Sequence, residues 1–153
     1  MKKIYLSKGK FALVDDEDYD FLIQWKWHIS QSGYAVRTDN RLKKTTMMHR
    51  EVNKTLKNLE TDHIDGNKIN NQKNNLRSAL KVQNQGNRKP QKGTSKFKGV
   101  CWNKENKNWR AGIRVNKKSK CLGSFKNEAD AARAYNIAAK EYFGDFAKVN
   151  EGV

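Results

Sequence analysis

Hydrophobic and polar residues alternate in the first part of the chain in patterns that predict short strands and short helices. Residues 2–14 alternate loosely around a Lys-Gly turn, which favours a β-hairpin. The acidic run that opens residues 15–27 suits the first turn of a short helix, because acids there interact favourably with the helix dipole. The predicted buried side of this helix consists of Phe21, Leu22 and Trp25. Two further strands and a second short helix are predicted at 33–39, 43–49 and 50–58.

The composition changes after residue 80. Residues 81–96 contain the only proline of the chain, two glycines and five basic residues, which indicates a helix end that becomes an exposed linker. We therefore expect a first domain at 1–90, a linker at 91–95 and a second domain at 96–150.

The second domain shows a pattern of three strands followed by one helix. The strand candidates, separated by polar turns, lie at 96–102, 108–115 and 120–125. Residues 126–144 predict a helix with Asn127 as its N-cap and Gly144 at its end. A stripe of small residues that lets this helix lie close on a sheet is formed by Ala131, Ala134 and Ala138. The expected fold class is α+β, with the second domain a three-stranded antiparallel sheet packed on one helix.

Charge narrows the class of partner. The chain carries a formal net charge of +16, from 32 Lys and Arg against 16 Asp and Glu. Such an excess attracts a polyanion, most commonly nucleic acid. Between Gly66 and Lys104 there are ten basic residues and no acidic residue. This indicates a face that meets phosphates, with a plain solvated face as the alternative. Double-stranded DNA is the expected partner, and no obligatory protein partner is evident.

Membrane and metal-thiolate classes find no support in the sequence. No stretch approaches 18 consecutive apolar residues, and the N-terminus lacks the apolar segment of a signal peptide. We expect a cytoplasmic protein without membrane contact. Cys101 and Cys121 form no CxxC pair and have no histidine pair nearby, so we expect reduced thiols and no zinc site.

Residues 61–80 concentrate groups that could cleave a phosphodiester. Hydrolysis needs a base that takes a proton from water and a hard divalent cation that stabilises charge on the phosphate. Asp62 and His63 supply a carboxylate and an imidazole side by side, and Mg²⁺ often needs only one or two protein ligands. A short helix predicted at 74–87 could bring Asn84 back towards this pair.

The stretch DHIDGNKINNQKNNLR, preceded by MMHREV and followed by LKVQNQGN, resembles the HNH homing-endonuclease family with its ββα-metal motif. The phage-type nicking members are the most similar, and the resemblance covers residues 47–89. It implies that His63 is the general base and that Asn75 orders the catalytic loop. It also implies that Asp62 and Asn84 bind a divalent metal, Mg²⁺ or Mn²⁺. An asparagine stands where colicin-type members have a second metal-binding histidine, which points to the phage type.

Other polar residues near this motif have less specific interpretations. Asn87 would replace Asn84 as a metal ligand if the helix register were shifted. We interpret His49 as a structural residue that orients the strand before the site, and His28 as an ordinary side chain. Basic side chains that could meet phosphates, with exposure to solvent as the alternative, are Lys68, Lys73 and Arg77.

The segments Lys-Gly-Val, Trp-Arg-Ala, Leu-Gly-Ser-Phe, Ala-Ala-Arg-Ala-Tyr and Phe-Gly-Asp-Phe-Ala resemble the plant ethylene-response-factor type of DNA-binding domain over residues 95–150. That family packs three antiparallel strands on one helix and reads the major groove with the sheet, a groove that admits a β-ribbon. At least one tryptophan could instead fill the core between sheet and helix. The resemblance assigns DNA contacts to Lys98, Trp102, Trp109, Arg110 and Arg114.

These observations together predict a metal-dependent, homing-type DNA endonuclease, phage-encoded and targeted by its C-terminal sheet. Because one such centre cuts one strand, a monomer is expected to nick. A non-catalytic, sequence-specific DNA-binding regulator is the alternative, and an RNA-binding protein is a third possibility. The intact set of Asp62, His63 and Asn84 favours the nuclease.

Overall fold

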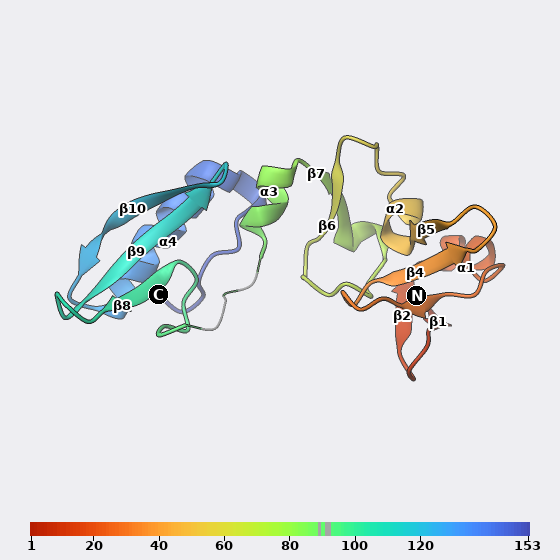
Figure 1. The fold of residues 1–153 in the computed structure, drawn as a ribbon, viewed down its shortest axis with the longest axis horizontal. Helices are drawn as coiled ribbons and strands as arrows, with labels where there is room; N and C mark the ends of the chain where they lie inside the picture. Colours follow the sequence, from red (N-terminus) through yellow and green to blue (C-terminus); the bar gives the residue numbers. More distant parts are fainter. Residues whose placement is uncertain (89, 91–92) are drawn as a thin grey trace. The chain divides into compact units, whose positions relative to one another are not determined.

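The computed structural model describes residues 1–153 apart from 89, 91 and 92, and it contains two compact units, residues 1–80 (unit 1) and 81–153 (unit 2). Small antiparallel sheets occur in both units, and a long helix lies near the C-terminus (Figure 1). The α+β class expected from the sequence is therefore confirmed. Among the described residues, no helix is long and apolar enough to cross a membrane.

Unit 1 opens with the predicted hairpin, in which β1 (Lys2–Tyr5) pairs antiparallel with β2 (Phe11–Val14). Helix α1 (Asp16–Leu22) follows and carries three acids in its first turn, as expected. The placement of Phe21 on the buried side was wrong, because its side chain is 49% exposed whereas Leu22 is fully buried. Neighbouring helix residues point in different directions, so this short helix turns only one of the two into the core.

The next sheet has the strand order β3-β4-β5 and leads directly into a helix. Its antiparallel strands are β3 (His28–Ile29), β4 (Ala35–Asp39) and β5 (Lys44–Met47). The strand predicted at 43–49 ends early, because α2 (Met48–Val52) begins at Met48. Met48 and His49 are both buried. The helix buries Met48 in the apolar core and His49 beside the rings of Tyr34 and His63.

The asparagine-rich stretch forms a second hairpin with a long loop. β6 (Glu60–His63) pairs antiparallel with β7 (Leu76–Ala79), and the 3₁₀ turn η1 (Lys73–Asn75) ends the loop. The helix predicted at 74–87 was therefore wrong over its first half. That part pairs with β6 and buries Leu76 and Ala79, the two ends of β7.

One apolar core holds unit 1 together, and it draws on strands and helices far apart in sequence. Its buried side chains are Ile4, Leu6, Ala12, Val14, Leu22, Trp27, Ala35, Met48, Val52 and Leu76. Trp25 is half-buried and packs against this core, as predicted.

Helix α3 (Lys81–Gly86) follows β7, so the chain runs strand, strand, helix through the predicted motif. The helix packs within unit 2, and the division between the units falls before it rather than at 90–95. Gly86 explains the packing, since a Cβ there would lie 2.6 Å from Cγ of Phe143. Its carbonyl also accepts hydrogen bonds from Lys98 Nζ and from Lys148 N, the latter at 3.0 Å. Part of the predicted linker lies outside the described residues.

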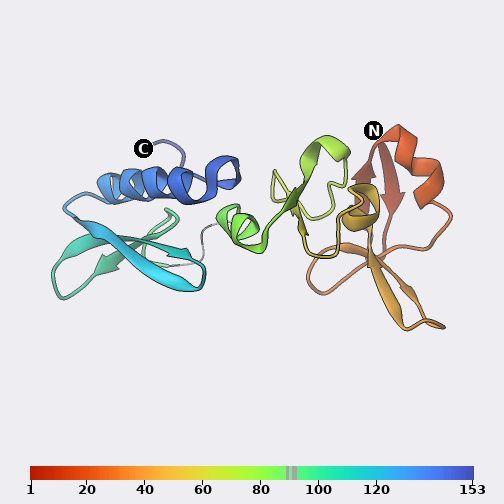
Figure 2. The same ribbon diagram turned by 90° about the horizontal axis from the view of Figure 1, so that it is seen from above.

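The remainder of unit 2 matches the predicted three strands and one helix. β8 (Val100–Asn103), β9 (Asn108–Val115) and β10 (Lys118–Phe125) form an antiparallel sheet in the order β10-β9-β8. Helix α4 (Glu128–Phe143) lies across one face of this sheet, as Figure 2 shows, and η2 (Gly144–Phe146) follows it. The predicted small residues pack towards the sheet, with Ala131 and Ala138 buried and Ala134 partly buried.

Lysines occupy left-handed backbone positions in the turns that join paired strands. The residues and their φ angles are Lys8 at 61°, Lys43 at 48°, Lys107 at 48° and Lys117 at 65°. Each turn thereby carries a positive charge at its tip, at a backbone conformation that glycine would adopt more readily.

Gly99 is the tightest point between the sheet and α4, and its replacement tests this packing. Its φ is +76°, and a Cβ would overlap the ring of Tyr135. We expect Gly99→Ala to lower the free energy of unfolding by about 3 kcal/mol, from strain and overpacking together. Gly144→Ala is the matched control, because Gly144 has a φ of +53° with no atom within 4 Å of an added Cβ. Urea unfolding of both variants measures the difference, and equal losses would contradict the close contact.

Candidate active site

The β6–β7 hairpin places the predicted carboxylate and imidazole in a buried position. Asp62 and His63 end β6 and are only 3% and 5% exposed. The register sets Asp62 opposite Arg77 and His63 opposite Leu76. Because side chains alternate along a strand, the two functional groups leave β6 on different sides. The hairpin thus holds both groups on one short rigid strand.

Arg77 binds the carboxylate of Asp62. Its Nε and Nη2 atoms both lie 2.9 Å from Oδ2 of Asp62. The structure places the Arg77 guanidinium on this carboxylate, and the phosphate contact suggested by the sequence stays a prediction. A guanidinium held this closely fixes the carboxylate orientation.

Asn75 closes the loop between β6 and β7. Its Nδ2 donates to Asp65 Oδ1 and to the carbonyl of Asn70, both at 2.9 Å, and its Oδ1 accepts from the backbone of Asp65 at 3.0 Å. Asp65 Oδ1 also accepts from the backbone of Asn67 at 2.7 Å. Burial would raise the pKa of Asp65, but hydrogen bonds from the Asn70 side chain, the Asn67 backbone and the Asn75 side chain outweigh it and lower that pKa. The asparagines of this loop therefore act as a set of mutual ties.

His63 lies in a pocket of rings and amides. Its ring centroid is 5.1 Å from that of His49, in an edge-to-face arrangement, and 6.0 Å from that of Tyr34. Its Nε2 is 3.3 Å from Oδ1 of Asn71. Burial lowers the pKa of His63 and outweighs the opposing effects of Asn71 and the nearby aspartates. The imidazole is neutral at neutral pH, the form in which it can accept a proton.

His49 packs against His63 from α2, and not from a strand as the sequence had suggested. It is 5% exposed, and its ring lies 5.0 Å from that of Tyr34. Burial, followed by the nearby His63 and Arg50, lowers the pKa of His49 to about 3. His49 is therefore a neutral packing partner of His63.

The lysines expected at phosphates have protein partners. Lys68 Nζ donates to the carbonyl of Ser32 at 2.9 Å and lies 4.8 Å from the Tyr34 ring centroid. Lys73 Nζ is 2.6 Å from Glu17 and 3.2 Å from Asp18. The acidic run of α1 thus neutralises Lys73, a pairing that the spacing of some 56 residues concealed.

The divalent cation expected from the sequence stays a prediction. Among the described residues, no group of three or more His, Cys, Asp or Glu side chains could hold a metal ion. A single carboxylate with amide oxygens remains, which fits Mg²⁺ because this ion retains several waters. Asn84 and Asn87 lie in unit 2, Asn84 on α3, and the place of either beside Asp62 stays a prediction.

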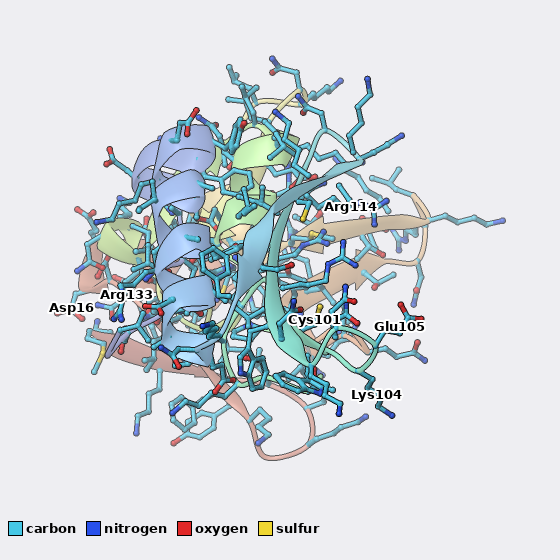
Figure 3. All side chains as sticks on the ribbon, turned by 90° about the vertical axis from the view of Figure 1, so that its left-hand side faces the viewer. Asp16, Cys101, Lys104, Glu105, Arg114 and Arg133 are labelled. Atoms are coloured by element: carbon cyan, nitrogen blue, oxygen red, sulfur yellow. The ribbon has the colours of Figure 1, made fainter. Side chains whose placement is uncertain are left out.

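In unit 2 the predicted DNA contacts lie on two faces of the sheet. Trp109 packs against the core formed by Ala111 and the alanines of α4. The ring centroids of Trp102 and Trp109 lie 5.0 Å apart in an edge-to-face arrangement. Arg110 and Arg114 alternate with these buried positions and are exposed. Figure 3 shows Arg114 and Cys101 on the side of the sheet away from α4.

Lys98 is partly buried, and burial followed by Lys148 and Arg88 lowers the pKa of its ammonium to about 8. It helps to line a cavity of about 740 Å³ within unit 2. Other basic side chains that line the cavity are Arg88, Arg110, Arg114 and Lys120. Both cysteines are free thiols, as expected.

The buried state of His49 predicts a pH-dependent stability. Unfolded histidine titrates near 6.5, well above the folded value, so protons bind the unfolded chain first as the pH falls. From pH 7 to pH 5 this removes about 2 kcal/mol of stability. His49→Phe keeps a ring beside His63 and should abolish that part of the loss. Urea unfolding of both proteins at each pH measures the difference, and because His63 titrates in both, an equal loss would contradict the buried neutral His49.

Proteins of similar sequence indicate the family to which this chain belongs. No family model matches the chain. An uncharacterized HNH endonuclease of Acanthamoeba polyphaga mimivirus is 35% identical over 151 residues, which cover 95% of this chain and 77% of that protein. Protein 3.8 of Escherichia phage T7 is 47% identical over 53 residues, 34% of this chain and 44% of that protein. Given the extent of the mimivirus match, this chain belongs to the HNH endonuclease family.

Proposed function

We propose that the chain is a metal-dependent endonuclease that hydrolyses phosphodiester bonds in double-stranded DNA. The observation that carries this proposal is the neutral, buried imidazole of His63 next to the buried carboxylate of Asp62. A neutral imidazole can take a proton from water, and a carboxylate oxygen suits Mg²⁺ or Mn²⁺. The mimivirus relative is named an HNH endonuclease, which supports the same class of reaction.

Each residue has a defined role in this proposal. His63 takes the proton from the attacking water, and Asn75 keeps the loop beside it closed. Asp62, oriented by Arg77, would hold the divalent cation, and the HNH resemblance assigns Asn84 as a further ligand. The bound cation supplies positive charge that stabilises the phosphate and the leaving oxygen. One centre of this kind cuts one strand, so a monomer nicks.

Unit 2 is proposed to bind and position the DNA. Its three strands on one helix agree with the ethylene-response-factor type of domain that the sequence resembles. Arg110 and Arg114 lie exposed on β9, where guanidinium groups can pair with guanine or phosphate. Trp109 instead stabilises the packing of the sheet on α4. The phage-type resemblance favours a homing-type enzyme, and the phage T7 relative supports a phage origin.

His63→Ala tests the catalytic role. Loss of a general base should lower the nicking rate by about 10²- to 10⁴-fold while DNA affinity stays within about twofold. Supercoiled plasmid is incubated with Mg²⁺ or Mn²⁺, and EDTA should abolish nicking by the wild type. His28→Ala is the matched control, because it removes a histidine of β3 that has no role in the proposed reaction. Equal nicking by wild type and His63→Ala would exclude this role. Binding without any cleavage by the wild type would favour the DNA-binding regulator.

Arg114→Gln tests the sheet as the DNA-binding face. We expect weaker binding and a salt dependence whose log–log slope falls by about one, because one phosphate contact is lost. Arg133→Gln is the control, since Arg133 lies on α4 and pairs with Asp130 at 2.8 Å (Figure 3). Fluorescence anisotropy of a labelled duplex over a range of salt gives both slopes. A larger effect of Arg133→Gln would place DNA on the helix side instead.

A further inference from the structure

Asn71 is a fully buried asparagine in the loop between β6 and β7, and it has no role in the proposed reaction described above. A buried amide is costly unless its polar groups have partners. Oδ1 lies 3.3 Å from His63 Nε2, and Nδ2 lies 3.4 Å from Sδ of Met48. The backbone N–H donates to the carbonyl of Leu13 at 2.8 Å. Each polar group that points inward therefore meets a defined partner.

The two side-chain contacts of Asn71 fix which end of the amide faces the imidazole. A thioether sulfur is only a weak acceptor and cannot donate, so the NH₂ group faces Met48 and the oxygen faces His63. An amide oxygen can only accept a hydrogen bond. Nε2 of His63 must then carry the proton, and in the neutral ring the lone pair lies on Nδ1.

The position of Asn71 is fixed by the first hairpin rather than by the loop alone. Leu13 of β2 donates to the carbonyl of Ile69 and accepts from the N–H of Asn71, each at 2.8 Å. These two bonds form a parallel bridge between Leu13 and Asn70. Because β2 is paired along its whole length with β1, the acceptor for His63 is held by a rigid element. Met48, fully buried on α2, closes the other side.

We propose that Asn71 is the positioning residue of this site, which holds His63 in the Nε2–H tautomer and so keeps the proton-accepting lone pair on Nδ1. The tautomer follows from contacts of Asn71, whereas its catalytic meaning rests on the proposed nuclease function. The wrong tautomer would present an N–H where a base is needed, and the rate would fall although every side chain that touches DNA remained in place.

The tautomer can be observed directly by NMR of the ¹⁵N-labelled full chain at neutral pH without metal. The protein has three histidines, and His63→Gln identifies the signals of His63 by their loss. In the wild type we expect a protonated, pyrrole-type Nε2 and a pyridine-type Nδ1. In Asn71→Leu both ring nitrogens should move towards averaged values, as in a ring that exchanges between tautomers. A wild-type Nδ1–H tautomer, or unchanged signals in the leucine variant, would overturn the proposal.

Asn71→Asp provides the conservative comparison, since its carboxylate still accepts from Nε2–H. It should keep the Nε2–H tautomer, and an Nδ1–H tautomer in this variant would count against the proposal. If the leucine variant does not fold, the aspartate variant decides the question.

Single-turnover plasmid nicking then separates positioning from a general loss of structure. Asn71→Leu should lower the cleavage rate at least about tenfold while DNA affinity changes less than about twofold. Asn71→Asp should recover most of the rate. Parallel losses in rate and affinity would indicate a structural role and overturn the proposal. If the wild type does not cleave with any divalent metal, the nuclease assignment fails, whereas the NMR result still tests the contact.

Discussion

Two backbone hydrogen bonds of Leu13 hold the candidate active site in place. They join β2 to the loop between β6 and β7, segments that are more than fifty residues apart in the sequence. The loop has no regular structure apart from η1, and its own hydrogen bonds run mainly from asparagines to Asp65. Without an external anchor such a loop would sample many conformations, since each ordered residue costs conformational entropy. The first hairpin is therefore part of the site although it supplies none of its polar side chains.

The charge distribution of the chain serves folding as well as binding. The clustered acids of α1 and the residue before it hold the end of the β6–β7 loop: Asp15 accepts from the backbone of Lys73 at 2.8 Å, and Glu17 pairs with its ammonium. The carboxylates therefore balance the charge of Lys73, which adds little to the positive charge available to DNA. The exposed arginines of β9 retain theirs. The net charge of +16 belongs to the whole chain, and it overstates the positive charge that unit 1 presents near η1.

Local patterns were sufficient for much of the fold and for part of the site. The first hairpin, the three strands of unit 2 and α4 follow from alternation, turn residues and caps, which are short-range signals. The helix predicted at 74–87 failed because pairing with β6 decides the conformation of its first half. Asn71 was only one of several unassigned asparagines, since its partners Leu13 and Met48 are distant in sequence. The exposed Arg114 and the packed Trp109 were assigned alike, because no helix position was yet available to separate the two faces.

The lysines at the tips of the strand turns have an evolutionary consequence. Each holds a left-handed backbone that costs a side-chain-bearing residue about 1 kcal/mol relative to glycine. A chain selected for stability alone would be expected to acquire glycine at Lys43 or Lys107. Directed evolution for heat resistance would therefore be expected to replace these lysines by glycine, with loss of the positive charge at each turn tip.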